Sequence, residues 1–113
     1  MNKLFSGIIL LLSFLNVSVS QPDQKGKVKH AFVCTDYTQG KVFVVSAEGK
    51  VEWEYPAENC NDIWVLPNGN LLFNTGHGVK ELTRKKEVVF DYESKSEIYA
   101  CQRLSNGNTF IGE

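Results

Sequence analysis

The chain has 113 residues, of which 42% are hydrophobic and 22% charged, and its formal net charge is −1. This composition is ordinary for a globular protein, and a chain so near neutrality offers no electrostatic argument for binding nucleic acid. Its three cysteines and two histidines show no CxxC or histidine-rich spacing, so the sequence predicts neither a metal site nor a bound cofactor.

Residues 1–20 are predicted to be a cleaved signal peptide. Lys3 is their only charged side chain, a largely apolar stretch covers residues 4–17, and small residues favour cleavage after Ser20. Polar residues interrupt the apolar stretch, which falls short of the roughly 18 clean apolar residues of a membrane span. We therefore expect an exported protein, secreted or periplasmic, with no membrane segment after cleavage and a polar leader over residues 21–29.

Beyond the leader, the chain consists of short strand patterns separated by turn residues. Val51, Trp53 and Tyr55 alternate with charged residues, as in a half-buried strand, and no stretch outside the signal shows sustained helical spacing. The predicted strands cover residues 30–35, 41–46, 50–55, 62–66, 70–75, 79–82, 88–92, 97–104 and 109–113. The basic segment 83–87 lies between two of them and is predicted to be a solvated hairpin tip.

Internal repeats relate these strands to one another. The segment LPNGN at 66–70 returns as LSNGN at 104–108, which is 38 positions later. A second alignment, with an offset of 37, pairs Trp53 with Phe90. Asn-Gly between apolar runs predicts a tight hairpin turn in which both central residues have positive φ. A period in the high thirties built only from strands and turns is typical of propeller blades.

We therefore predict an all-β fold of β-propeller blades, each a four-stranded antiparallel sheet within residues 30–113. The first blade, about 30–56, lacks its inner strand; the second, about 61–93, is whole; and the third starts at about 97–113. Propellers typically have four to eight blades. We therefore expect an incomplete propeller, with the remaining blades missing from this chain because it is part of a longer sequence or an incomplete product.

The segment GKVFVVSAEGKVEWEY, residues 40–55, resembles the repeat of pyrroloquinoline-quinone-type propellers. Blades of that family carry a motif like G-x-V-[YF]-x-[LV]-[DS]-x-x-x-G-K-x-x-W, and here the spacing before the second glycine is one residue shorter. The matching residues are Gly40, Val42, Phe43, Val45, Ser46, Gly49, Lys50 and Trp53. The Asn-Gly segments resemble those of arylsulfotransferase-like exported bacterial propellers. The resemblance implies that Gly49 and Trp53 carry packing between neighbouring blades.

The same resemblance sets requirements for an enzyme. A quinone dehydrogenase of this type would need a vicinal Cys-Cys disulfide, a calcium site and a catalytic Asp, and the chain has no Cys-Cys pair. An arylsulfotransferase would need a nucleophilic histidine at the mouth of the channel. His77, in the loop TGHG, is the candidate for that role, and a turn or backbone role is the alternative.

The candidate ligand-binding residues follow from propeller topology. Loops that join an outer strand to the next inner strand, or a second strand to a third, lie on one face around the central channel. In this chain those loops contain acidic and amide side chains and one imidazole, which would suit a sugar, a cationic ligand or a divalent metal. The predicted site residues are Asn61, Asp62, His77, Glu97 and Glu113, with Asp36 in the same set of loops. The alternative is that Asp62 and Glu97 cap backbone amides at strand starts.

The residues of these loops are compatible with two functions. The first is a non-enzymatic scaffold that binds a carbohydrate, a peptide or a partner protein at the channel face. The second is a propeller enzyme of the sulfotransferase or lyase/hydrolase type that uses His77 and acidic channel residues. A redox propeller is disfavoured by the missing Cys-Cys pair. Cys34 and Cys101 fall within predicted strands, where a free thiol would act as a small hydrophobe.

Overall fold

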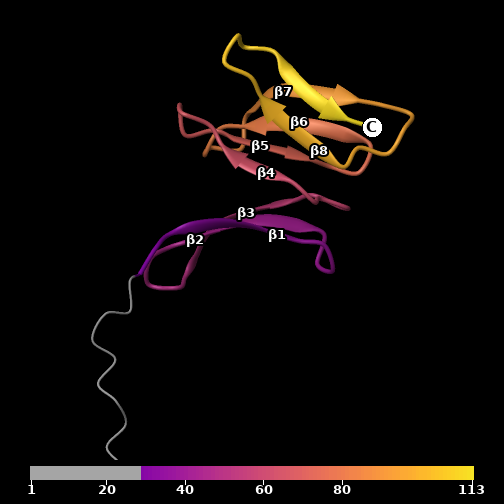
Figure 1. Cartoon of the computed structure of the whole chain (residues 1–113). Coiled ribbons are helices and arrows are strands. Elements are labelled where there is room, and N and C mark those ends of the chain that lie inside the picture. The colour runs from indigo at the N-terminus through magenta and orange to yellow at the C-terminus, as the bar shows by residue number, and fades with distance from the viewer. Residues whose placement is uncertain (1–28) are drawn as a thin grey trace, which may run out of the picture.

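A computed structural model describes residues 29–113, so the predicted signal peptide and nearly all of the polar leader lie outside the described residues. The described part contains nine strands and no helix (Figure 1). The strands are β1 (Phe32–Asp36), β2 (Lys41–Val45), β3 (Val51–Pro56), β4 (Ile63–Val65), β5 (Leu71–Asn74), β6 (Gly78–Leu82), β7 (Val88–Glu93), β8 (Ala100–Arg103) and β9 (Thr109–Gly112). The predicted all-β class is confirmed. Within residues 29–113, no helix is long and apolar enough to cross a membrane.

The strands form three sheets, in the orders β1-β2-β3, β4-β5-β6-β7 and β8-β9. Every pairing is antiparallel, as expected from the alternating pattern, and strands adjacent in a sheet are also adjacent in the chain. The three sheets lie on one another as successive layers (Figure 1). Connections between strands therefore lie at the two ends of the layers, and loops from different sheets come close to one another there.

Four hairpin turns share one hydrogen-bond pattern. The first residue of each turn donates its N–H to the carbonyl oxygen four residues later, at 2.8–2.9 Å, and accepts from the N–H three residues later, at 2.8–3.0 Å. These first residues are Ser46, Leu66, Thr83 and Leu104. The residue three positions later has positive φ in every case: Gly49 (82°), Gly69 (85°), Lys86 (69°) and Gly107 (87°). This is a three-residue loop, a type I turn followed by one left-handed residue.

The expectation that both residues of each Asn-Gly pair have positive φ is wrong. Among the described residues, positive φ occurs at the glycines of these pairs and not at Asn68 or Asn106. Instead, the side-chain Oδ1 of each asparagine accepts from the N–H two residues later, at 3.0 Å. Pro67 favours this geometry in the first copy because its ring holds φ near −65°, the value that a type I turn needs.

The repeat is also visible in the strand pairing. The β2–β3 pair has an irregularity between Val44 and Val45, and the β6–β7 pair has one between Glu81 and Leu82, 37 positions later. The sheet β1-β2-β3 thus corresponds, strand for strand, to the part β5-β6-β7 of the four-stranded sheet. In the described residues, no strand borders β1 in the way that β4 borders β5.

Two apolar clusters hold the layers together. Between the first and second sheets, buried Val42 and Val44 pack with Phe73 and other residues of β5 and β6. Between the second and third sheets, Leu72 packs with residues that include Cys101. All four residues of β5 are 0% exposed. Because successive side chains of a strand point to opposite faces, β5 contributes to both clusters and is the centre of the core.

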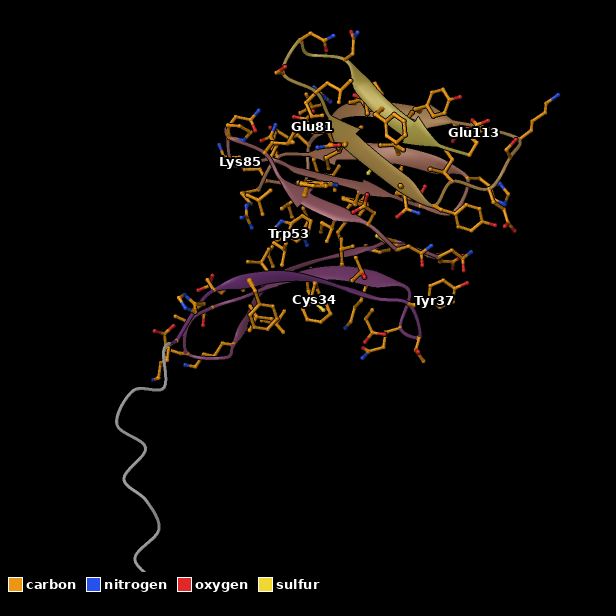
Figure 2. All side chains as sticks on the ribbon, in the orientation of Figure 1. Cys34, Tyr37, Trp53, Glu81, Lys85 and Glu113 are labelled. Atoms are coloured by element: carbon orange, nitrogen blue, oxygen red, sulfur yellow. The ribbon has the colours of Figure 1, made fainter. Side chains whose placement is uncertain are left out.

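Trp53 connects the first sheet to the second (Figure 2). Its indole N–H donates to the carbonyl oxygen of Arg84 in the β6–β7 turn at 3.0 Å, its ring stacks on Tyr55 at 6.2 Å, and Lys86 lies 5.9 Å from the ring centre. The expected packing of Trp53 against a neighbouring sheet is therefore observed. Gly49 differs, because it is exposed and a Cβ atom there would meet no atom within 4 Å. Its role is to adopt positive φ, and the packing role expected for it is wrong.

The second and third sheets share a buried ion pair in addition to apolar contacts. Glu81 on β6 is 3% exposed and accepts from Arg103 on β8 at 2.8 Å and from Asn70 at 2.7 Å. The Arg103 guanidinium also lies 5.5 Å from the ring centre of Phe90. Phe90 thus pairs with a cation between sheets, as its repeat counterpart Trp53 does.

Candidate functional site

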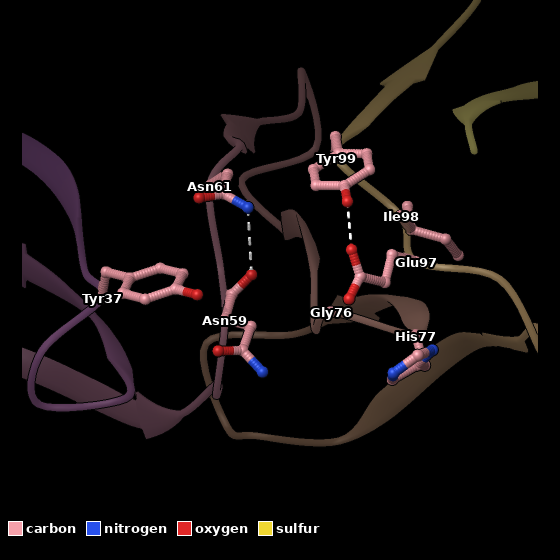
Figure 3. A pocket seen from close by; sticks show the side chains of 8 residues that line it. All are labelled: Tyr37, Asn59, Asn61, Gly76, His77, Glu97, Ile98 and Tyr99. Carbon is pink, nitrogen blue, oxygen red and sulfur yellow. Dashed lines mark hydrogen bonds between the residues drawn. The ribbon is translucent and has the colours of Figure 1, made fainter.

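Four loops converge at one end of the layers and enclose a pocket of about 100 Å³ (Figure 3). They are the loops between β1 and β2, β3 and β4, β5 and β6, and β7 and β8, so residues adjoining all three sheets take part. The pocket is lined by Tyr37, Asn59, Asn61, Gly76, His77, Glu97, Ile98 and Tyr99. These are the loops that the repeat topology places on one face.

The structure brings some of the predicted site residues together and separates others. Asn61, His77 and Glu97 line the pocket, whereas Asp62 and Glu113 are not among its lining residues. The carboxylate of Glu113 instead accepts from the hydroxyl of Tyr92 at 3.2 Å. Asp36 is likewise engaged elsewhere, because its carboxylate binds the backbone N–H and the side-chain amide of Gln39 at 2.9 and 2.7 Å.

Asp62 has the structural role that the capping alternative predicts. Its Oδ2 accepts from the backbone N–H of Cys101 at 2.9 Å and from the indole N–H of Trp64 at 3.3 Å. The capped amide belongs to β8 in the third sheet and not to the start of β4, so Asp62 joins the second sheet to the third. For Glu97, the hydrogen bond in the described residues runs to the hydroxyl of Tyr99 and not to a backbone amide.

Asn74, at the end of β5, holds two of the pocket loops in place. Its side chain is fully buried, and its Oδ1 accepts from the backbone N–H groups of Asn61 and Asp62 at 2.8 and 2.9 Å. Its Nδ2 donates to the carbonyl oxygens of Ile98 at 2.7 Å and Asn59 at 3.5 Å. One carboxamide therefore uses both its acceptor and its donors to fix the β3–β4 loop against the β7–β8 loop.

His77 is held by its neighbours in one ring orientation. Its Nδ1 lies 3.1 Å from the carbonyl oxygen of Ser96, and its backbone N–H and C=O bind Thr75 and Ser94 at 2.9 and 2.8 Å. A carbonyl oxygen can only accept, so in the neutral imidazole this contact places the ring proton on Nδ1 and leaves Nε2 as an acceptor. The imidazole is exposed and borders the pocket (Figure 3).

Two residues with positive φ approach each other beside the pocket. Gly76 has φ of 75° and Asn59 has φ of 55°. A Cβ atom on Gly76 would lie 3.0 Å from the Cβ of Asn59, so only glycine lets the β5–β6 loop approach the β3–β4 loop this closely. The unusual backbone of both loops is therefore concentrated at the pocket wall.

The carboxylate of Glu97 accepts a hydrogen bond from the hydroxyl of Tyr99. This bond and the negative charge of Glu97 raise the pKa of Tyr99, because both favour the neutral phenol. Among the eight lining residues, Glu97 is the one acid, and none is a lysine or an arginine. The pocket is thus weakly negative and carries side-chain amides, an imidazole and two phenols.

The cysteines lie outside the pocket lining. Cys60 and Cys101 are each 1% exposed, and burial raises the pKa of Cys60 to about 11 and that of Cys101 to about 12. Both are therefore neutral thiols at physiological pH and pack as small apolar groups. All three cysteines are free. In residues 29–113, no cluster of three or more His, Cys, Asp or Glu side chains could hold a metal ion.

Besides Gly76 and Ile98, sequence reasoning missed four residues with polar side chains that form or position the pocket. They are Tyr37, Asn59, Asn74 and Tyr99. Asn74 carried a detectable signal, since an asparagine interrupts the apolar run of β5 and a buried amide needs several hydrogen-bond partners. Tyr99 was missed because the sequence predicts a strand over 97–104, whereas β8 begins at Ala100. Tyr37 carried no signal, because exposed aromatic residues in loops are common.

The comparisons with known proteins concern the fold alone. No protein-family model matches the chain, and no curated protein is similar to it. A solved structure of a protein of unknown function from Bacteroides caccae matches with a TM-score of 0.63 and 22% sequence identity. The match covers 74% of this chain and 32% of the other, so the chain spans about a third of the length of the structure that it matches. At this identity the likeness extends to the fold.

Proposed function

We propose that the chain is part of an exported β-propeller with pyrroloquinoline-quinone-like repeats, and that it acts as a binding scaffold. Three observations support the propeller. The sheets are layered and antiparallel, four hairpins repeat one turn, and the strand irregularities recur 37 positions apart. Each antiparallel sheet would then be one blade, with β4 and β8 as equivalent strands of successive blades.

One observation carries the binding role: loops adjoining three separate sheets converge on a single polar pocket. A ligand at this place contacts several repeats at once, whereas a hairpin tip offers the side chains of one turn. Figure 2 draws Tyr37, at the pocket, and Lys85, at the β6–β7 tip, at opposite ends of the layers. Lys85 therefore provides a control position that is remote from the pocket.

The test is a binding screen on the full mature chain by two-dimensional amide NMR, with sugars, short peptides and amines as probes. We expect the signals that shift to belong to the four pocket loops, and the shifts to weaken in His77→Ala and Asn61→Ala but not in Lys85→Ala. Shifts centred on the hairpin tips, or a binding loss confined to Lys85→Ala, would contradict the proposal.

Edman sequencing of the exported protein tests the predicted cleavage after Ser20.

The enzyme alternative rests on the fixed ring of His77. Its Nδ1–H is directed to Ser96, so Nε2 is available to accept a proton or attack an electrophile. A sulfotransferase would also need a cation to hold the sulfate, and the lining residues include no lysine or arginine. The scaffold is thus the better supported proposal. Turnover of 4-nitrophenyl sulfate or 4-nitrophenyl glycosides that His77→Gln abolishes would favour the enzyme.

A further inference from the structure

The hydrogen-bonding groups that remain free at the pocket restrict the class of ligand. On this basis, and resting on the proposed binding role, we infer that the pocket takes a neutral polyhydroxylated ligand, namely one uncharged sugar unit of a glycan. The protein leaves donors and acceptors unused at the pocket, the lining residues carry little charge, and two tyrosines border the site.

Several acceptors at the pocket have no protein partner among residues 29–113. The Oε2 atom of Glu97 binds Tyr99, which leaves Oε1, and Asn61 donates from Nδ2 to the carbonyl oxygen of Asn59, which leaves Oδ1. Binding of His77 Nδ1 to Ser96 leaves Nε2 as a third acceptor. A ligand at this place must therefore offer hydrogen-bond donors.

The pocket also retains donors. The carboxamide of Asn59 and the hydroxyl of Tyr37 make no side-chain hydrogen bond within the described residues, and each can donate as well as accept. The pocket therefore offers free donors as well as free acceptors, and Figure 3 draws the side chains that carry them. Sugar hydroxyls match such a surface because each one donates a proton and accepts another.

Charge excludes the anionic alternatives. A sulfate, phosphate or uronate would meet the carboxylate of Glu97 and the lone pairs described above, with no lysine or arginine in the lining to neutralise it. A cationic ligand fits less well than a neutral one. It would pair with a single carboxylate that already accepts from Tyr99, and the donors of Asn59 and Tyr37 would stay unused.

The two tyrosines supply the apolar part of the site. Tyr37 follows β1 and Tyr99 precedes β8, so they come from the first and third layers, and they are 61% and 58% exposed. Figure 3 draws Asn59 and Asn61 between them. A pyranose ring has C–H faces as well as hydroxyls, and an exposed phenol offers an apolar face beside a polar tip.

The experiment titrates the full mature chain with matched methyl glycosides by amide NMR. The neutral set is glucose, galactose, mannose and N-acetylglucosamine, and the charged set is glucuronic acid and glucosamine. We expect at least one neutral glycoside to shift the signals of residues 59–61, 76–77 and 97–99, and to bind at least tenfold more tightly than either charged one. Asn61→Ala should weaken that binding about tenfold. Gln102→Ala, which removes an exposed amide on β8 outside the pocket, should leave it unchanged.

A second variant tests the charge argument without altering the shape of the site. Glu97→Gln keeps an acceptor but removes the negative charge, so neutral binding should change less than about threefold while the glucuronide gains affinity. Tighter binding of the glucuronide or the glucosaminide to the unaltered pocket would overturn the inference and leave the binding role standing. If no compound of either charge, and no peptide or amine, perturbs the pocket signals, the inference and the proposed function both fail.

Discussion

At the scale of single residues, the pocket depends on a side chain that does not line it. Asn74 is fully buried, and its carboxamide binds backbone atoms of Asn61, Asp62, Ile98 and Asn59. These atoms belong to two loops from different connections, so the loops keep their separation only while the amide is present. An isosteric apolar side chain would leave the backbone groups without partners, and that loss is larger than the loss of one hydrogen bond.

We therefore expect Asn74→Leu to lower the free energy of unfolding by about 2–4 kcal/mol and to alter the pocket loops. Urea unfolding followed by tryptophan fluorescence measures the first effect, and amide NMR of residues 59–62 and 97–99 the second. Asn61→Ala is the control. It removes an exposed amide with one hydrogen bond, so its effect should stay below about 1 kcal/mol. Equal effects of the two variants would contradict this role of Asn74.

The two tryptophans differ in how strongly they support the fold. Trp53 packs against the cluster between the first two sheets and donates to Arg84, whereas Trp64 is 43% exposed and donates to Asp62. Trp53→Ala should cost about 3 kcal/mol of stability, the lower end of the range for large aromatic truncations, because the ring is only half-buried. Trp64→Ala should cost about 1 kcal/mol or less. If Trp64→Ala lowers the urea unfolding midpoint more than Trp53→Ala does, the contact of Trp53 between the sheets contributes little to stability.

The buried thiols predict a loss of stability at alkaline pH. Burial raises the pKa of Cys60 to about 11 and of Cys101 to about 12, above the value of 9.0 for a free thiol. Stability from the neutral thiols is thus complete below pH 9 and declines as the pH rises from about 9 to 12, since the unfolded chain releases these protons first. Unfolding midpoints at pH 8 and pH 10 test this. The double variant Cys60→Ala/Cys101→Ala should lose less stability over that interval.

At the scale of elements, the strands and their boundaries were largely predictable, and the turn geometry was not. Alternation at Val51, Trp53 and Tyr55 identifies β3 because a half-buried strand must alternate. The Asn-Gly pairs identify the hairpins, but the actual loop has three residues, and Lys86 adopts the position that glycine occupies elsewhere. Sequence patterns report which residues prefer water. They carry little information on how the backbone closes a turn.

The four equivalent turns allow two opposite substitutions at the position with positive φ, one that replaces a glycine and one that introduces a glycine. Gly69→Ala should destabilise by about 1 kcal/mol, because alanine is strained at φ of 85°. A Cβ atom there would meet no atom within 4 Å, so the effect belongs to the backbone alone. Lys86→Gly removes the same strain at φ of 69° but also removes the cation near Trp53, so stability should change by less than about 1 kcal/mol. Thermal unfolding of both variants checks the comparison.

The candidate site was predictable in its location and only partly in its residues. The repeat assigns the loops at 58–62, 74–78 and 94–97 to one face, and the structure has residues of all three around the pocket. Topology fixes loop position because strands of known direction leave little choice. It does not fix side-chain direction, and therefore Asp62 binds Cys101 instead of lining the pocket.

At the scale of the whole molecule, the two outer layers expose residues whose repeat counterparts are buried. Phe32 and Leu71 occupy equivalent positions, because Phe32 pairs with Val45 and Leu71 pairs with Leu82. Phe32 is 53% exposed, whereas Leu71 is 0% exposed. The third sheet shows the same contrast on its outer face. Each outer face thus has the chemistry of an interface between layers but carries no further layer in the described residues.

These outer faces predict head-to-tail association of the chain. Phe110 is 52% exposed, and its counterpart in the second sheet is Leu72, which packs against the third sheet. The counterpart of Phe32 is Leu71, which packs against the first sheet. The third sheet of one copy can therefore receive the first sheet of the next, a heterologous contact that extends into oligomers. In sedimentation velocity we expect Phe110→Lys to shift the chain toward monomer, since a charge in that contact would be desolvated. The control Val89→Lys alters an exposed residue of β7 and should leave the oligomers intact. Oligomers that persist in Phe110→Lys and dissociate in Val89→Lys would place the contact on β7 instead.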